Sequence, residues 1–412
     1  MIGAIRRVIY VVVIAAACCS GAFAEERDTA LLNELQRCAF EFFWDQASPS
    51  TGLVKDRAGN FADDDHKVAS IAATGFGLAA LPVACERKWI NHVTARDRAL
   101  TTLKFFAEKA EHERGFFYHF LGFTSAKRAS GCELSSIDTA LLLAGVIVVR
   151  EYFQDDDVTR YANLIYDRVD FDWMLNGGKT FSMGWKPEGG FLRERWWDYN
   201  ESILIILLAL GSRTHPVGPE VWHALHRKKG VYRGITVIQS PPLFTHQYAQ
   251  LYFDFRDKHD DYADYFSNSR NAAICNMLFC RSEADKYSTY RKGYWGLTAS
   301  DGPNGYKAYG AKPGGALSDG TVAPTAAIAS VMFTPHASLR FMQELYTNEK
   351  RWLWGYYGFS DAFNIDEEWN SPDVIGIDQG PILLGIENYR TGLIWRLFSG
   401  APEVELAFRK AG

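Results

Sequence analysis

Carboxylate residues recur along this chain at points where an apolar segment begins. Glu201 follows two tryptophans, Trp196 and Trp197, and precedes the apolar run 202–210 (SILIILLAL). Burial disfavours the charged form of a carboxyl group and raises its pKa, which suits a general acid. The alternative is that Glu201 only caps its helix or pairs with a neighbouring arginine. On this segment alone, both interpretations stay open.

Other polar residues occupy similar positions near the predicted starts of apolar helices. They are Glu133, Asp138, His246, Gln247, Asp319, Asp378 and Gln379. Hydrolysis of a glycosidic bond requires two carboxyl groups, one that protonates the leaving oxygen and one that activates water or attacks directly. Glu201 is predicted to be the acid, with Asp138 as its partner and Glu133, Asp378 and Asp319 as rivals of Asp138. Acids also cap helices, so each of them taken alone has that second explanation.

Hydrophobic periodicity predicts about twelve helices that would position these residues. Their ranges are 28–45, 68–86, 95–110, 136–153, 156–169, 199–210, 219–228, 243–256, 262–280, 321–333, 335–347 and 379–398. The even-numbered helices are apolar all round or lined with small residues, which indicates burial, whereas the odd-numbered ones are amphipathic. Long segments lead into the even helices and short segments leave them, so neighbouring helices are expected to be antiparallel.

This alternation predicts an all-α fold, an (α/α)6 toroid built as a double ring of about twelve helices. The starts of the even helices would meet at one rim, where the long loops would form a cleft. Short strands are expected in these loops at 116–120 and 180–185. No linker or internal repeat divides the chain, so residues 25–412 are predicted to form a single domain.

Residues 1–24 have the pattern of a secretory signal peptide, with Arg6 and Arg7 before an apolar segment and Ala22-Phe23-Ala24 as a cleavage site. We therefore expect a periplasmic protein. Cys18 leaves room for a lipoprotein form, although the residues before it lack the expected aliphatic side chain. No later apolar run of ~20 residues suggests a membrane span. The formal net charge of −5 argues against nucleic acid or an anionic membrane as the main partner.

A set of ordered motifs then gives a resemblance. The motifs are 136–142 (SIDTALL), Glu201 with 208–216 (LALGSRTHP), 243–248 (LFTHQY), 295–302 (WGLTASDG), 358–364 (GFSDAFN) and 376–381 (GIDQGP). They resemble the glycoamylase-like family that contains the β-1,2-glucanases of glycoside hydrolase family 144. The resemblance covers about residues 31–398. One departure is Arg213, where the family form has proline.

The resemblance implies an (α/α)6 barrel and endo-type, inverting hydrolysis of linear β-1,2-glucan to short sophoro-oligosaccharides. It implies Glu201 as general acid, with Glu133 and Asp138 near the cleaved bond. On this hypothesis, further polar and aromatic residues would line the cleft. They are Asp56, Arg57, Trp197, Tyr199, His246, Gln247, Arg256, Trp295, Asp319, Asp361, Asn364 and Gln379.

The expected partner is this glucan or a related oligosaccharide, bound by a monomer that uses no cofactor or metal. The sequence contains no phosphate-binding loop, no serine-hydrolase elbow and no zinc motif. Two alternatives stay open. One is an exo-acting hydrolase or transglycosylase on the same glucan, and the other is a glycan-binding protein without catalysis. Several carboxylates at helix starts favour catalysis, because binding alone does not need them.

Overall fold

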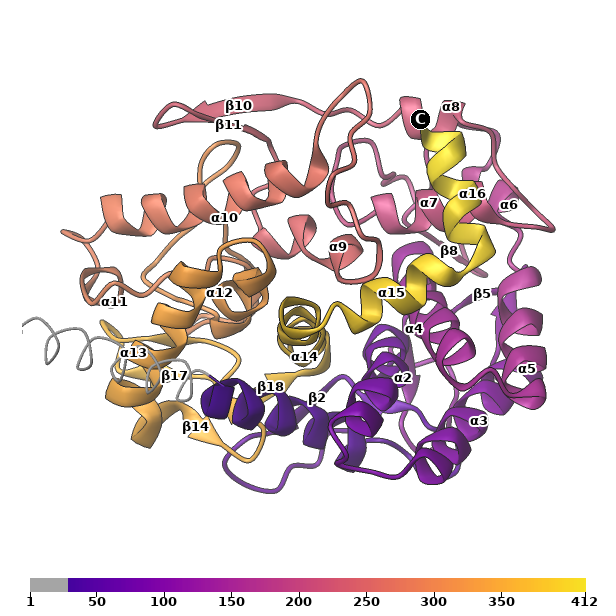
Figure 1. The fold of residues 1–412 in the computed structure, drawn as a ribbon, viewed down its shortest axis with the longest axis horizontal. Helices are drawn as coiled ribbons and strands as arrows, with labels where there is room; N and C mark the ends of the chain where they lie inside the picture. The colour runs from indigo at the N-terminus through magenta and orange to yellow at the C-terminus, as the bar shows by residue number, and fades with distance from the viewer. Residues whose placement is uncertain (1–28) are drawn as a thin grey trace, which may run out of the picture.

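The computed structural model describes residues 29–412, so the predicted signal peptide lies outside the described residues. Six helices form an inner ring, and all of them were predicted as the even-numbered helices (Figure 1). They are α2 (Ile71–Glu86), α4 (Ser136–Phe153), α7 (Ile203–Gly211), α9 (Tyr248–Tyr252), α12 (Pro324–Ala329) and α14 (Gly376–Arg390). Nearly every residue in them is buried, which confirms that all-round apolar character marks the inner layer.

Amphipathic helices cover this ring from outside. They are the helix 29–45, α3 (His92–Glu108), α5 (Asp156–Asp167), α10 (Tyr265–Ser282) and α13 (Pro335–Leu353). In α5, for example, Val158, Ala162 and Ile165 are buried at helical spacing while the intervening charged residues face solvent. The (α/α)6 prediction is therefore confirmed. No helix within residues 29–412 has both the length and the apolar character to cross a membrane.

The inner helices α2 and α4 meet backbone to backbone. A Cβ atom added at Gly145 would lie 2.0 Å from the carbonyl oxygen of Gly75, and one added at Gly75 would lie 2.4 Å from that of Leu141. Only glycine permits so close a crossing, because any side chain would separate the two helices. This contact sets the spacing of the ring between two helices that begin at the rim.

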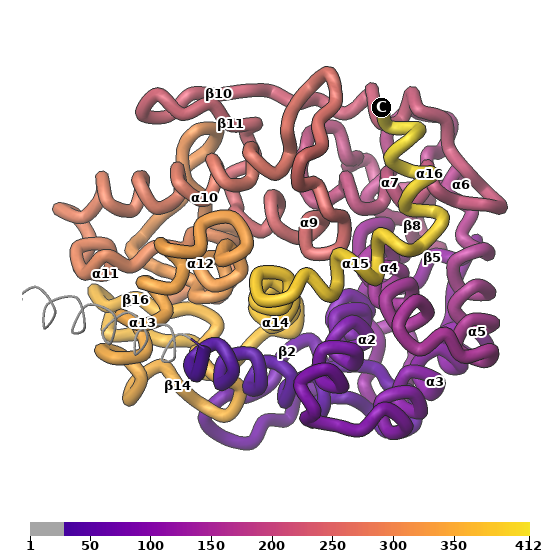
Figure 2. Tube along the Cα trace, in the orientation of Figure 1, coloured from indigo at the N-terminus to yellow at the C-terminus, as the bar shows by residue number. Residues whose placement is uncertain are grey.

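The two ends of the described chain close the ring. Figure 2 shows the indigo helix 29–45 beside the yellow α14. The Gln36 side chain donates from Nε2 to the carbonyl oxygen of Leu383 (3.2 Å) and to Glu387 Oε2 (2.8 Å). Arg87, which follows α2, forms an ion pair with the same Glu387 carboxylate at 2.8 Å. These contacts join the first described helix, α2 and α14.

Several predicted helices are shorter than expected. The range 219–228 contains only α8 (Glu220–His223), and a hairpin of β10 (Lys229–Tyr232) and β11 (Ile235–Ile238) follows it. The range 243–256 becomes η1 (Leu243–His246) and α9. The range 379–398 is split into α14 and α15 (Leu393–Gly400), because Gly392 has a left-handed φ of +66°. The helix α16 (Pro402–Ala411), which packs on α7, was not predicted.

The remaining elements are short and lie mostly in the connecting segments. The helices are α6 (Phe171–Leu175), α11 (Ser288–Arg291) and η2 (Ser330–Met332). The strands are β1 (Val54–Lys55), β2 (Arg57–Gly59), β3 (Val68–Ser70), β4 (His112–Glu113), β5 (Phe116–Phe117), β6 (Phe120–Gly122), β7 (Leu134–Ser135), β8 (Gly184–Lys186), β9 (Gly190–Phe191), β12 (Ala299–Ser300), β13 (Lys307–Ala308), β14 (Trp354–Gly355), β15 (Gly358–Phe359), β16 (Phe363–Asn364), β17 (Trp369–Asn370) and β18 (Asp373–Ile375).

These strands fix the starts of three inner helices. The strands β3, β7 and β18 run directly into α2, α4 and α14. Each is held by antiparallel partners, in the sheets β1–β3–β6 and β7–β8–β9 and the pair β2–β18. Side chains at these helix starts therefore have fixed positions relative to one another.

Candidate active site

Glu201 lies in the turn that begins α7, where the N–H of Leu204 donates to its carbonyl oxygen (3.0 Å). The residue is only 9% exposed. Trp196 anchors the preceding segment, because its Nε1 donates to Ser136 Oγ (2.9 Å) at the start of α4. Burial, together with the nearby charge of Asp138, raises the pKa of Glu201 to about 7. A large share of this carboxyl group is therefore protonated at neutral pH, as a general acid requires.

Asp138, in the first turn of α4, is held by Ser135 and His119. Ser135 Oγ donates to Asp138 Oδ2 (2.5 Å), and His119 Nε2 lies 3.5 Å from the same oxygen. The other ring nitrogen of His119 lies 3.0 Å from Glu133 Oε1. Burial opposes a charge on His119, but the two carboxylates outweigh it and raise the pKa of His119 to about 8. The hydrogen bond to His119 in turn lowers the pKa of Glu133.

A second group of acids surrounds Arg57. Arg57 Nη1 lies 3.1 Å from Asp301 Oδ2 and 3.6 Å from Asp373 Oδ2, and Arg57 Nε lies 3.4 Å from Asp56 Oδ2. The pairing of β2 with β18 places Arg57 opposite Ile375, one residue before α14. Burial raises the pKa of Asp56 despite the neighbouring guanidinium. One cation thus holds three carboxylates from separate loops.

Asp361 and Asp378 form a buried pair beside the Arg57 group. Each is 4% exposed, and Asp361 Oδ2 accepts the N–H of Asp301 (2.9 Å). Burial and then the charge of Asp301 raise the pKa of Asp361 to about 7, while burial and the charge of Asp361 raise that of Asp378 well above its usual range. Tyr306 lies beside the pair and is 50% exposed; burial around its hydroxyl and then the charges of Asp378 and Asp361 raise its pKa.

Tyr248 connects the two acid groups. This buried side chain on α9 donates its hydroxyl to the carbonyl oxygen of Ile377 (2.9 Å). Its pKa is raised by burial first, and then by charges that include Asp378, Glu201 and Asp138. Asp378 and Glu201 begin different inner helices, so the rim brings acids from α4, α7 and α14 around one tyrosine. The structure therefore assembles the four acids Glu201, Asp138, Glu133 and Asp378 into one region.

Three residues expected in the cleft are buried beneath it instead. Tyr199 stacks on Tyr265 with ring centroids 5.8 Å apart. His246 Nε2 contacts the carbonyl oxygen of Ser240 (3.0 Å), and burial lowers the pKa of His246 to about 4, so the ring is neutral. Gln247 donates to the carbonyl oxygen of Ala326 (2.9 Å), which joins η1 to α12. Their contacts support the inner ring.

Three other expected residues also have structural contacts. Trp295 is buried against Phe341, with centroids 6.1 Å apart. Asn364 donates to the carbonyl oxygen of Asp319 (3.0 Å). The Asp319 carboxylate in turn accepts from the Tyr309 hydroxyl (3.0 Å) and from the N–H of Thr321 (3.1 Å), and such contacts lower the pKa of Asp319 despite partial burial.

The last three expected residues differ in their surroundings. Trp197 is 51% exposed and available to a ligand. Gln379 is buried next to Asp378, and its Oε1 has no hydrogen-bond partner among the described residues. Arg256 is not brought to the cluster. It follows the far end of α9, pairs with Asp254 at 2.7 Å, and lies over the indole of Trp395 at 4.2 Å.

Sequence reasoning missed His119, while Asp301 and Tyr248 lay in the quoted motifs 295–302 and 243–248 without being assigned a role. His119 lies in the long segment that leads into α4. This position near the rim is the feature of the sequence that could have indicated a role in the site. The pairing of His119 with Glu133 and Asp138 depends on β5, β6 and β7, which are each two or three residues long and carry almost no periodic pattern.

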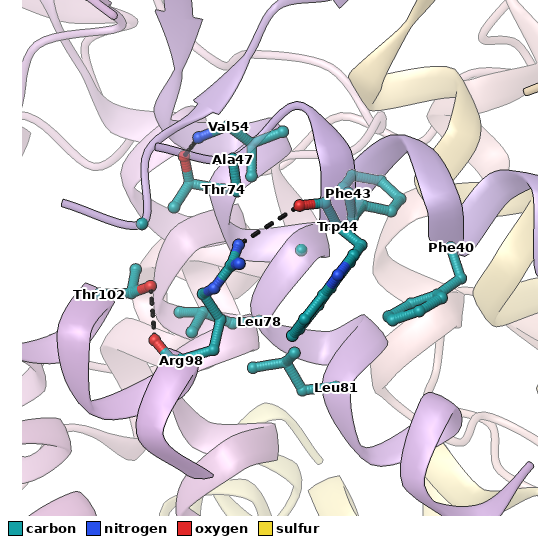
Figure 3. A pocket seen from close by; sticks show the side chains of 12 residues that line it. Phe40, Phe43, Trp44, Ala47, Val54, Thr74, Leu78, Leu81, Arg98 and Thr102 are labelled. Carbon is teal, nitrogen blue, oxygen red and sulfur yellow. Dashed lines mark hydrogen bonds between the residues drawn. The ribbon is translucent and has the colours of Figure 1, made fainter. Parts of the chain in front are cut away.

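Figure 3 shows a separate pocket between the helix 29–45, α2 and α3. Its lining is mostly apolar, and Arg98 lies over the Trp44 ring at 4.3 Å while donating to the carbonyl oxygen of Trp44 (3.4 Å). No carboxylate lines it. Among residues 29–412, no group of three or more His, Cys, Asp or Glu side chains has the arrangement of a metal site. The acid cluster is therefore the candidate active site.

Known proteins match this chain over most of its length. Residues 193–402 match the Glycoamylase family model, described as "Putative glucoamylase". An exo beta-1,2-glucooligosaccharide sophorohydrolase (non-reducing end) from Parabacteroides distasonis is 29% identical over 93% of this chain, which spans 58% of that relative's length.

Solved structures agree with these matches. An endo-beta-1,2-glucanase from Chitinophaga pinensis, in complex with sophorotriose and glucose, is 30% identical with a TM-score of 0.85, covering 93% of this chain and 98% of that one. A beta-1,2-glucanase from P. distasonis is 28% identical with a TM-score of 0.86, covering 93% of this chain and 60% of that one. On the family match and these relatives together, the chain belongs to the Glycoamylase family.

Proposed function

We propose that this protein is an exported glycoside hydrolase that cleaves linear β-1,2-glucan at internal linkages and releases short sophoro-oligosaccharides. The observation that carries the proposal is the buried carboxyl group of Glu201, whose pKa is raised to about 7, among other acids at the rim. Family membership supports the reaction class. The Chitinophaga and Parabacteroides relatives, whose names specify β-1,2-linked glucans, support the substrate.

The proton balance of an inverting reaction fits this arrangement. Glu201 gives its proton to the leaving glycosidic oxygen, and a second carboxylate takes a proton from the attacking water. Asp138 is the better supported base, because the His119 ring and the Ser135 hydroxyl both contact its Oδ2 and hold the carboxyl group in place. Asp378 is less suited, because its carboxyl group holds or shares a proton with Asp361. The two catalytic groups exchange protonation states over one turnover.

Replacement of the acid tests this assignment. Glu201→Gln keeps the shape of the side chain but has no proton to give, so kcat on linear β-1,2-glucan should fall by about 100-fold or more. Binding of the glucan, measured by calorimetry, should persist. The matched control is Glu194→Gln, an exposed residue of the same loop, which should retain wild-type turnover. A loss of less than about tenfold in the Glu201→Gln variant would remove Glu201 from the acid role.

Exo-action is the second candidate, and the sophorohydrolase relative favours it. Products sampled early in the reaction separate the two modes. Internal cleavage gives a ladder of oligosaccharides and a rapid fall in mean chain length. Removal of single disaccharides from one end gives sophorose alone, and cyclic or lengthened products would indicate transglycosylation. Binding without the release of reducing ends would instead indicate a glycan-binding protein.

Export is supported by the sequence of residues 1–24, which have the form of a cleavable signal. Mass spectrometry of the protein from its native cells should find a mature chain that begins at Glu25. Recovery in the periplasmic fraction would agree with this, and an uncleaved chain in the cytoplasmic fraction would contradict it.

A further inference from the structure

We propose that His119 is a positioning residue of this site, whose imidazolium ion holds the carboxyl group of Asp138 in place so that it can act as the base. The inference deepens the proposed function and rests on it. Of the two groups that exchange protons with substrate and water, His119 contacts only Asp138, so its effect on the reaction is indirect.

The contacts of the two ring nitrogens argue for the charged form. Nδ1 lies 3.0 Å from Glu133 Oε1, and Nε2 lies 3.5 Å from Asp138 Oδ2. A neutral imidazole carries a proton on only one nitrogen, so one carboxylate would then face a lone pair. Only the imidazolium ion offers an N–H to both acids.

The ring is fixed by its surroundings. It stacks on Phe120 with centroids 3.8 Å apart and an interplanar angle of 16°. The N–H of His119 donates to the carbonyl oxygen of Glu133 (3.0 Å), and its carbonyl oxygen accepts the N–H of Ile71 (3.3 Å). The backbone is therefore tied both to the segment before α4 and to the start of α2. A histidine held in this way serves as a rigid bridge between two acids.

The charged groups around His119 show why Asp138 requires a neighbouring cation. Asp138 on α4, Glu133 before β7 and Asp56 between β1 and β2 all act on the imidazole with negative charge. Arg57 is directed to Asp56, and Lys186 on β8 acts on Glu133. The imidazolium is thus the cation adjacent to Asp138. Without it, the carboxyl group of Asp138 would face the like charges of Glu133 and Asp56 with no adjacent cation to hold it in place.

The His119 imidazolium ion thus affects both the proposed base, Asp138, and the proposed acid, Glu201. An ionised Asp138 is a competent base, and its charge also raises the pKa of Glu201. A pair of acids whose environments separate their pKa values is the general arrangement for acid and base catalysis near neutral pH. His119 keeps the carboxyl group of Asp138 where its charge acts on Glu201.

The test compares pH profiles of kcat/KM for two substitutions of His119. His119→Gln keeps a hydrogen-bond donor but removes the positive charge beside the acids of the site, so the acidic limb of the profile should move upward by about one pH unit. His119→Arg keeps the positive charge and should leave the limb near its wild-type position, with a lower kcat. The control is His112→Gln, which replaces an exposed histidine on β4 that contacts Arg168 and should leave the profile unchanged.

An acidic limb in His119→Gln that coincides with the wild-type limb would overturn the inference, because a purely structural role lowers kcat without moving the limb. Should both variants fail to fold, ring-nitrogen NMR of histidine-labelled wild-type protein decides the question. A ring that stays protonated at pH 7, and whose signal persists in His112→Gln, supports the inference, and ten neutral rings at that pH overturn it. A wild-type protein inactive on every glucan would contradict the proposed function, yet the NMR result would still report the state of His119.

Discussion

Asp361 and Asp378 form a buried pair of carboxyl groups, in which burial and then the charge of Asp361 raise the pKa of Asp378. Asp361 Oδ1 and Asp378 Oδ2 have no hydrogen-bond partner in the described part of the chain. Two ionised carboxylates in one buried site repel each other, so the protonated form of one of them is favoured. The Asp361–Asp378 pair therefore stores a proton within the acid cluster, beside Arg57 and its three carboxylates.

This shared proton predicts an unusual dependence of stability on pH. The pKa of Asp361 rises from 3.8 to about 7 on folding, so its stabilising contribution is complete below the lower value and is lost as the pH rises through the higher one. Asp361→Asn cannot titrate. The free energy of unfolding, measured with guanidinium chloride, should therefore fall less between pH 5 and pH 8 in this variant than in the wild type.

Asp319→Asn is the matched control for that experiment. The pKa of Asp319 is lowered on folding, so its stabilising contribution is present above its ordinary pKa and is lost only in more acidic solution. The control should lose similar stability at pH 5 and pH 8. An Asp361→Asn protein with the full wild-type slope would show that no proton is stored in the pair.

Glu201 should make the fold less stable at the pH where it acts. Its pKa rises from 4.5 to about 7, so the favourable protonated state is progressively lost relative to the unfolded chain across this interval. Glu201→Gln removes the free-energy cost of ionising this buried carboxyl group. The variant should therefore be more stable than the wild type by up to about 3 kcal/mol at pH 8 and by little at pH 4. Thermal or denaturant unfolding at both values would measure it. Equal effects at the two pH values would contradict the raised pKa.

Arg57 should contribute strongly to the free energy of unfolding, because it is the cation that pairs with several carboxylates at the rim. Arg57→Met leaves the carboxylates of Asp56 and Asp301 without their cation and should destabilise the protein by about 2–4 kcal/mol. Arg213 provides the comparison, because its ion pair with Asp167 is more exposed, and Arg213→Met should lower stability by less than about 1 kcal/mol. Denaturant unfolding of both variants at pH 7 gives the two values, and equal losses would rule out a special role for Arg57.

The crossing of α2 and α4 predicts a large effect of a single methyl group. Gly145→Ala would place its Cβ 2.0 Å from a backbone oxygen of Gly75, so the helices must separate. We expect a loss of about 3 kcal/mol or more, in the range of severe overpacking. Gly189→Ala is the control, because a Cβ there meets no atom within 4 Å. A melting temperature within a degree of the wild type for Gly145→Ala would contradict the close crossing.

The sequence allowed the inner ring and the candidate acids at its rim to be predicted for identifiable reasons. All-round apolar segments such as α4 can only be buried, and Glu201 stood out because a carboxylate before such a segment is hard to explain otherwise. His119 was not predicted, because the strands that bring its partners close to it are too short to show an alternation of apolar and polar residues. Arg256 was wrongly expected in the cleft, because it follows the C-terminal end of α9 and so lies away from the rim where the inner helices begin.

The contacts between the helix 29–45 and α14 have a consequence for how the protein is made. Gln36 and Leu383 lie 347 residues apart in sequence, so the ring cannot close until nearly the whole chain has been synthesised. Contacts of such long range slow folding, because the entropy of closing the intervening loop is lost before the contact stabilises anything. Until then, the faces of the first helix and α2 that pack on α14 stay uncovered. The growing chain is therefore most prone to aggregate at its earliest-made segment, and a chaperone that shields this segment should raise the yield of folded protein.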